Sequence, residues 1–242
     1  MRIMEDMLNC ISDGNRITPD VWHIGEGRQD MAGSLDRISF RDLYQKYILV
    51  KDIDRRTLLT IKAGGFHVRE DDNAALLYGY IDHEAGLSFE VVSAACIFPD
   101  GAVALEPANP QTSMKLRYGS FSGEVQSYSF EDFEDPFLLK QEIIGSGYKA
   151  DPGVEQLRGM KELDDSRAPG YPDDILVYFI REGLRNEGIW CRSEGVDMES
   201  RTVRMKMLNE PMGSFGKHIG DEVGVRLYTM TDGSVKAVAV LD

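Results

Sequence analysis

The chain has 242 residues, of which 42% are hydrophobic and 28% are charged, and this composition excludes a largely disordered protein. It carries 27 basic and 41 acidic side chains, a formal net charge of −14. This negative charge disfavours binding to nucleic acid or to anionic membranes and favours a basic protein as a partner.

Residues 4–11 place apolar side chains at helical spacing and predict a short amphipathic helix. Acidic residues at positions 5 and 6 interrupt what would have to be the apolar core of a signal peptide, and no segment approaches the roughly 20 apolar residues of a membrane span. We therefore expect a cytoplasmic protein with no membrane partner. Residues 13–37 predict a loop with one strand near Val21 and Trp22.

Residues 39–47 predict a helix that is capped by Ser39, with Asp42 in the capping-box position. From residue 57 onward the sequence becomes typical of β-strands. Four short segments rich in β-branched and aromatic residues predict an antiparallel meander: 57–65, 75–82, 87–98 and 101–107. Asp100-Gly101 predicts a tight hairpin between the last two, because such a turn requires positive φ angles.

Residues 115–121 and 123–130 predict a further strand pair. Residues 130–144 then predict a helix that starts or is interrupted at Pro136, and its acidic residues beside Phe130, Phe133 and Phe137 suit docking onto a basic protein. The glycine-rich and polar residues 145–153 predict a linker.

The linker divides the chain into two predicted domains. Residues 1–146 form an N-terminal α+β domain that is largely an antiparallel sheet with flanking helices. Residues 147–242 form a C-terminal small β-barrel domain led by a helix, which Asp151 caps and in which Pro152 takes the first position. The predicted fold class is therefore α+β.

The C-terminal strands follow from their hydrophobic patterns. Residues 173–180 are apolar on both faces and predict a strand that is covered on both sides. Residues 202–208 alternate between apolar and polar side chains, which predicts one buried and one solvated face. Asp232-Gly233 predicts a hairpin between two further strands. Five strands in under 80 residues predict a small barrel.

Residues 52–66 and 197–211 share an aspartate, an Arg-Thr pair and alternating apolar residues. Either two related barrel-like units or chance similarity would explain this.

The most distinctive segment is "NEPMGSFGKHIGDEVGVRLY", residues 209–228. It follows an aromatic strand with Trp190 and a hairpin, and it combines Leu-Asn-Glu-Pro, a glycine-rich loop and Gly220-Asp221 before the next strand. In these features residues 175–240 resemble a bacterial family, domain of unknown function 2314. The resemblance implies a small β-rich domain, and because the family has no established activity, it implies no catalytic residue.

Turn chemistry explains much of this segment. Asn209 can bond its own backbone, Pro211 ends a strand ladder, and glycines allow positive φ around Phe215, whose ring is expected to close the barrel end. The functional interpretation is that one barrel mouth gathers a ligand- or partner-binding site. Its predicted residues are Trp190, Asn209, Glu210, Phe215, His218 and Asp221.

The sequence offers no pattern for metal, cofactor or nucleophile chemistry. The four histidines form no metal-ligand spacing, and His83 is expected in an exposed turn. Cys96 and Cys191 lie in apolar strands, where thiols are inert, and no phosphate-binding glycine motif is present. The preferred prediction is a non-catalytic binding module for a protein partner. The alternative is a small-molecule enzyme with acid-base groups at the C-terminal barrel mouth.

Overall fold

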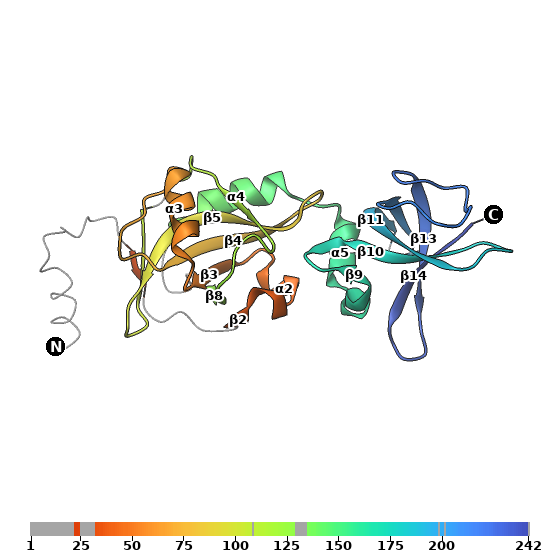
Figure 1. Ribbon diagram of the computed structural model, residues 1–242, viewed down its shortest axis with the longest axis horizontal. Helices are drawn as coiled ribbons and strands as arrows, with labels where there is room; N and C mark the ends of the chain where they lie inside the picture. Colours follow the sequence, from red (N-terminus) through yellow and green to blue (C-terminus); the bar gives the residue numbers. More distant parts are fainter. Residues whose placement is uncertain are drawn as a thin grey trace, which may run out of the picture.

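The computed structural model describes residues 22–24, 32–107, 109–128, 135–197, 199–200 and 202–241. The helix predicted in residues 4–11 lies outside these ranges, and so do Phe130, Phe133 and residues 131–134 of the predicted docking surface. Phe137, the third aromatic residue of that surface, is 2% exposed and packs in the core, so its predicted contact with a partner is wrong. Figure 1 shows a curled sheet and a barrel side by side along the long axis, with one helix at the junction between them. The α+β fold class with a C-terminal barrel is confirmed.

The first sheet consists, in the described part of the chain, of eight strands. They are β1 (Trp22–Ile24), β2 (Ala32–Ser34), β3 (Tyr47–Lys51), β4 (Ala74–Asp82), β5 (Gly86–Ile97), β6 (Val103–Leu105), β7 (Lys115–Arg117) and β8 (Glu124–Tyr128). Their order is β1-β6-β5-β4-β3-β8-β2, with β7 paired to β5, and every pair is antiparallel. The Asp100-Gly101 hairpin is confirmed, since Gly101 has a φ of 90° between β5 and β6.

Helices cover both faces of this sheet. They are the 3₁₀ turn η1 (Leu35–Arg37), α2 (Phe40–Leu43), α3 (Arg55–Ala63) and α4 (Leu138–Gly147). Leu58 and Ile61 of α3 pack into the core on the face that holds Ile48. Ile144 of α4 packs on the opposite face, which holds Leu49. Successive side chains of β3 therefore point alternately into two core layers, one on each face of the sheet.

Residues 57–65 were predicted as a strand, but 57–63 belong to α3 and 64–65 form the turn after it, so that prediction is wrong. Asp54 caps the helix by accepting the Thr57 amide at 2.9 Å, and the three-residue spacing of Leu58 and Ile61 buries both on one helical face. Residues 52–66 thus contain a helix where residues 197–211 contain strand, and their similarity is chance.

Two further predictions need correction, one of a helix and one of a strand pair. The helix capped by Ser39 is confirmed but ends at Leu43, and the chain turns at Gln45, which has a φ of 57°, into the unpredicted strand β3. Strands β7 and β8 exist but do not pair with each other. β7 adds to β5, and β8 lies between β3 and β2.

The second sheet closes into a barrel. It is led by α5 (Pro152–Gly159) and η2 (Lys161–Ser166) and consists of β9 (Arg167–Ala168), β10 (Tyr171–Ile180), β11 (Glu187–Asp197), β12 (Thr202–Met207), β13 (Glu222–Thr229) and β14 (Val235–Val240). The Asp151 cap is confirmed, with its Oδ1 accepting the Gly153 amide at 2.8 Å. β10 pairs antiparallel with β11 and parallel with β14. Strands β10 to β14 therefore form a closed ring of five. A ring with an odd number of strands must contain one parallel pair, which here is β10 with β14, and the predicted barrel is confirmed.

The barrel strands follow the predicted alternation with one exception. Val203, Met205 and Met207 are buried as expected, and Gly233 has a φ of 86° in the predicted hairpin. The prediction that residues 173–180 are covered on both sides is confirmed for 173–175, which are buried throughout. It is wrong for the second half of the strand, where inward-facing Phe179 is fully buried but outward-facing Tyr178 is 37% exposed. The barrel thus presents apolar side chains to solvent.

The connection between the two sheets is shorter than the predicted linker. Helix α4 extends to Gly147 and α5 begins at Pro152. That residues 1–146 and 147–242 fold as separate domains stays a prediction. In the part of the chain that the structure describes, no helix has the length and apolar character needed to cross a bilayer.

Candidate functional site

The 208–221 loop is bonded to the neighbouring strand β11. Asn209 Oδ1 accepts the Trp190 amide at 2.8 Å, and the Leu208 amide donates to the Trp190 carbonyl at 2.8 Å. The bond that sequence reasoning expected within the turn is secondary, with Asn209 Nδ2 3.4 Å from the Glu210 carbonyl. Asn209 therefore continues the hydrogen bonding to β11 beyond Met207, where strand β12 ends.

The three predicted acid-base groups lie together. Glu210 Oε1 lies 2.5 Å from His218 Nδ1, its Oε2 accepts the Ile219 amide at 2.9 Å, and Asp221 Oδ2 accepts the His218 amide at 2.9 Å. The Ile219 amide and His218 lower the pKa of Glu210, and Glu210 raises the pKa of His218. Both side chains are largely exposed, so their bonds close a turn at the surface.

Phe215 lies in the barrel core. Its ring is 3% exposed and packs edge-to-face on Phe179, with ring centroids 5.8 Å apart. A Cβ on Gly213 would lie 2.7 Å from the Phe215 ring, and Gly216 turns the chain with a φ of 70°. Of the six predicted residues, Phe215 is thus the one that faces inward.

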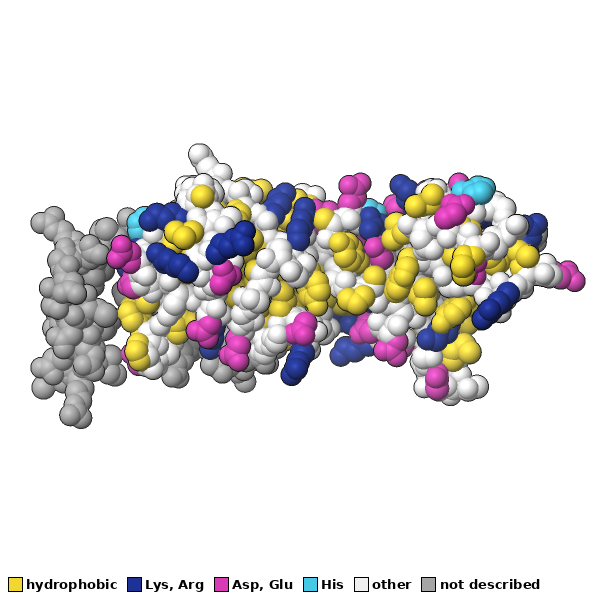
Figure 2. All heavy atoms as spheres, in the orientation of Figure 1, with side chains coloured by type: hydrophobic (Ala, Val, Ile, Leu, Met, Phe, Trp, Pro, Cys, Tyr) yellow, Lys and Arg dark blue, Asp and Glu magenta, His cyan; other side chains and the backbone are white. Residues whose placement is uncertain are grey.

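Trp190 belongs to an apolar patch on the outside of the barrel. We call this patch the barrel face; it comprises Leu176, Tyr178, Ile180, Trp190, Val238 and Val240. Trp190 lies opposite Leu176, Tyr178 opposite Val238, and Ile180 opposite Val240, so the patch is continuous across β11, β10 and β14. Trp190 and Val240 are 36% and 68% exposed. Figure 2 shows hydrophobic side chains over the visible side of the barrel.

Two basic side chains and one ion pair adjoin the barrel face. Arg226 lies opposite Val238, and Lys236 lies opposite Tyr228. Arg192 forms two bonds with Asp174, at 2.6 and 2.9 Å, so this acidic side chain is neutralised by its neighbour. Arg226 and Lys236 thus place basic side chains next to the barrel face of an otherwise acidic chain.

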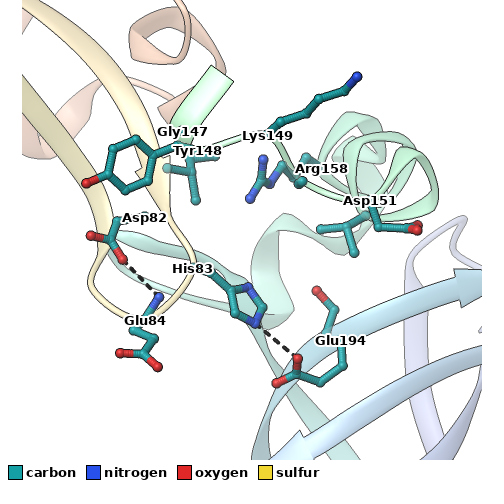
Figure 3. Close-up of a pocket in the computed structure, with 13 residues that line it drawn as sticks. Asp82, His83, Glu84, Gly147, Tyr148, Lys149, Asp151, Arg158 and Glu194 are labelled. Atoms are coloured by element: carbon teal, nitrogen blue, oxygen red, sulfur yellow. Dashed lines mark hydrogen bonds and ion pairs between the residues drawn. The ribbon is translucent and has the colours of Figure 1, made fainter. Parts of the chain in front are cut away.

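A cleft of about 390 Å³ lies between the first sheet and the barrel (Figure 3). The β4–β5 turn, the connection after α4, helix α5 and β11 line it. His83 reaches across from the turn, with Nε2 3.2 Å from a Glu194 carboxylate oxygen. Its side chain is 45% exposed, so the predicted exposure is partial.

A buried ionic network lies beside the cleft. Arg158 is 4% exposed and donates two bonds to Asp173, at 2.8 and 2.6 Å, and one bond to Glu155, at 2.7 Å. Burial alone would raise the pKa of Asp173, but the bonds from Arg158 hold it below its usual value. No local pattern marks these residues, since Arg158 and Asp173 belong to a helix and a strand that meet only in the fold.

A second buried acidic group lies on the first sheet. Asp72 accepts the Arg69 amide at 2.7 Å, and Arg69 Nε lies 2.5 Å from the buried Glu106, which also contacts His67. Burial raises the pKa of Asp72 to about 6, and the negative charge of Glu106 adds to this effect. One arginine therefore faces two buried carboxylates.

Substitution Asp72→Asn is expected to stabilise the protein at neutral pH. Because the folded-state pKa is raised, the ionised carboxylate costs stability above pH 6, and this cost vanishes below the ordinary value of 3.8. The gain should therefore grow from zero near pH 4 to at most about 3 kcal/mol above pH 6. Urea unfolding at several pH values measures it. The neighbouring Asp71→Asn, whose side chain is 61% exposed, is the control and should show a much smaller growth, because the charge of Asp71 is a minor cause of the raised pKa of Asp72.

Other reactive groups are few among the described residues. No group of three or more His, Cys, Asp or Glu side chains there could hold a metal ion. Cys96 and Cys191 are buried, and burial raises the pKa of Cys191 to about 12. The chain matches no protein-family model, and comparisons with curated proteins and with solved structures found no match.

Proposed function

We propose that the protein is a non-catalytic binding module that holds a segment of a partner protein on the barrel face. The observation that carries this proposal is the continuous apolar patch on three neighbouring strands, with Trp190, Tyr178 and Val240 open to solvent. Single exposed apolar side chains are common on proteins, whereas contiguous patches are typical of interaction sites. Trp and Tyr also supply much of the binding energy at protein interfaces.

The charges around the barrel face indicate the chemistry of the bound segment. Arg226 and Lys236 adjoin the patch. They favour a segment whose apolar side chains are flanked by aspartate or glutamate. The basic partner predicted from the net charge would have to contact another, acidic surface, and it remains a second form of the proposal. From the sequence alone we also propose a cytoplasmic location and the assignment of residues 175–240 to the family of domain of unknown function 2314.

Selection from a random peptide library on the immobilised full chain tests this function. We expect the selected peptides to carry apolar residues beside acidic ones. Their affinities, measured by isothermal titration calorimetry, should fall about tenfold or more for Trp190→Ala and for Tyr178→Ala. The control is Leu59→Ala on α3, an apolar side chain that is 52% exposed and lies far from the barrel face, and it should bind like the wild type.

Peptides that bind wild type and Trp190→Ala equally would contradict the proposal, as would a library that yields no peptide above background. Fluorescence adds a direct readout. In a Trp22→Phe background Trp190 is the sole tryptophan, and its emission should shift when a peptide covers it.

The alternative function is a small-molecule enzyme at the loop end of the barrel. The contact of Glu210 with His218, which raises the pKa of that imidazole, favours it. However, Glu210 also uses its second oxygen on the Ile219 amide, and Asp221 is bonded to the His218 amide. Variants distinguish the two functions: His218→Ala would abolish a chemical activity of this loop, whereas it should leave peptide binding to the barrel face intact.

A further inference from the structure

Several polar bonds join the first sheet to the barrel and its leading helices. Tyr44 donates its hydroxyl to Glu155 at 2.6 Å, and Arg41 donates two bonds to Asp164, at 2.7 and 2.8 Å. Units of one chain that meet through polar contacts are expected to move relative to each other, in contrast to units joined by a large apolar interface. The geometry of these contacts therefore determines how firmly the barrel is docked.

One backbone bond fixes the approach of the two units. The Leu87 amide donates to the Gly170 carbonyl at 2.7 Å. A Cβ on Gly86 would lie 2.3 Å from that carbonyl oxygen, and a Cβ on Gly170 would lie 2.4 Å from the ring of Tyr118. The backbones thus meet at a distance that only glycine permits, next to the turn that carries His83.

His83 is held between two carboxylates of the barrel. Its Nε2 lies 3.2 Å from Glu194, and its Nδ1 lies 3.8 Å from Asp173. The other charged groups around the cleft are Asp82, Glu84, Lys149, Asp151 and Arg158. Of these, Asp82 is bonded to Arg117 and to turn amides, and Arg158 is bonded to Asp173. Carboxylates exceed cations around the ring, so a protonated imidazole is favoured there.

We propose that His83 is a pH-sensitive latch that docks the barrel onto the first sheet when its imidazole is protonated and loosens the contact when it is neutral. Asp173 and Glu194 raise the pKa of His83 above its ordinary value of 6.5, while partial burial opposes them. Both carboxylates belong to the barrel, so undocking removes the effect. By linkage, the stabilisation of the docked state is complete below pH 6.5 and is lost as the pH rises through the raised value.

This inference is independent of the proposed peptide binding, although the two sites are close. Glu194 and Trp190 both lie on β11, four residues apart. The latch and the barrel face therefore share one strand, but the cleft is lined by Ser193 and Glu194 of that strand and by no residue of the barrel face.

Distance measurements between spin labels test the latch. Labels are attached to Lys62→Cys on α3 and to Thr231→Cys in the β13–β14 hairpin, both exposed positions. The background is Cys10→Ser, and the buried Cys96 and Cys191 should stay unlabelled. We expect one narrow distance population at about pH 5.5 and a second, longer population at about pH 8.5. His83→Gln should show the longer population at both pH values.

His218→Gln is the matched control, because His218 is also paired with a glutamate and also has a raised pKa but lies away from the interface. It should keep the pH response of the wild type. A wild-type distance distribution that is the same at both pH values would overturn the latch. So would a His83→Gln variant that retains the full pH response, or a His218→Gln variant that loses it.

Discussion

Phe215→Ala is expected to destabilise the barrel by about 3–5 kcal/mol, because the ring is buried in the core and its loss leaves a cavity. The ring packs edge-to-face against Phe179 at the point where the 208–221 loop returns to the barrel. The loop around it is held by surface hydrogen bonds, which cannot fill the space. Denaturant unfolding monitored by Trp190 fluorescence, in the Trp22→Phe background, measures the barrel specifically.

The control for this prediction is Met212→Ala in the same loop. Met212 is 94% exposed, so its truncation should change the stability by less than about 0.5 kcal/mol. A loss below 1 kcal/mol for Phe215→Ala would mean that the loop does not contribute to the barrel core. Phe215→Leu should retain peptide binding, because position 215 faces inward; loss of binding with intact stability would instead assign this residue a contact with the ligand.

Local sequence patterns predicted the structure correctly where the burial of one face determines whether a segment forms a helix or a strand. Residues 202–208 alternate strictly, and the barrel buries Val203, Met205 and Met207 as that pattern requires. The two Asp-Gly hairpins were predictable for a similar reason, since positive φ is a local demand that glycine meets. In these segments tertiary contacts support the choice that the local sequence already favours.

Predictions of helices and strands were wrong where contacts between residues distant in the sequence determine the structure. Residues 57–65 contain Thr, Leu and Ile in numbers typical of a strand, but the Asp54 cap and the packing of Leu58 and Ile61 on the sheet make them a helix. Strand β3 was missed because its Tyr and Val residues follow a one-turn helix without a glycine or proline to mark the change. Capping residues were the signal that could have identified α3.

The candidate sites also divide into those that the local sequence could predict and those that depend on distant contacts. Asn209, Glu210, His218 and Asp221 are close in sequence, so the functional interpretation could place them together, and the loop brings Glu210, His218 and Asp221 into contact. The cleft was not predictable, because His83 and Glu194 are separated by 111 positions and meet only when the barrel docks. The barrel face left one signal that was misread: residues 173–180 are apolar on both faces, which is typical of a covered strand and equally of a strand that binds a partner.

The second large effect is expected for Lys140→Met in α4. The Lys140 ammonium is buried, donates to the carbonyls of Val91 and Thr112 at 2.5 and 2.8 Å, and lies 3.4 Å from the buried carboxylate of Glu90. Burial lowers the pKa of Lys140, and Glu90 opposes this shift. Removing the cation leaves Glu90 as an uncompensated buried charge, which costs about 3–5 kcal/mol in the free energy of unfolding.

The double variant Lys140→Met with Glu90→Gln separates charge from packing. A glutamine at position 90 can still accept the Met114 amide, which Glu90 accepts at 3.1 Å, and it carries no charge. The double variant should therefore be more stable than Lys140→Met alone, and a double-mutant cycle from urea unfolding gives the coupling. A single variant as stable as the wild type, or a double variant no better than the single one, would show that α4 is held on the sheet by its apolar contacts and that the buried pair contributes little.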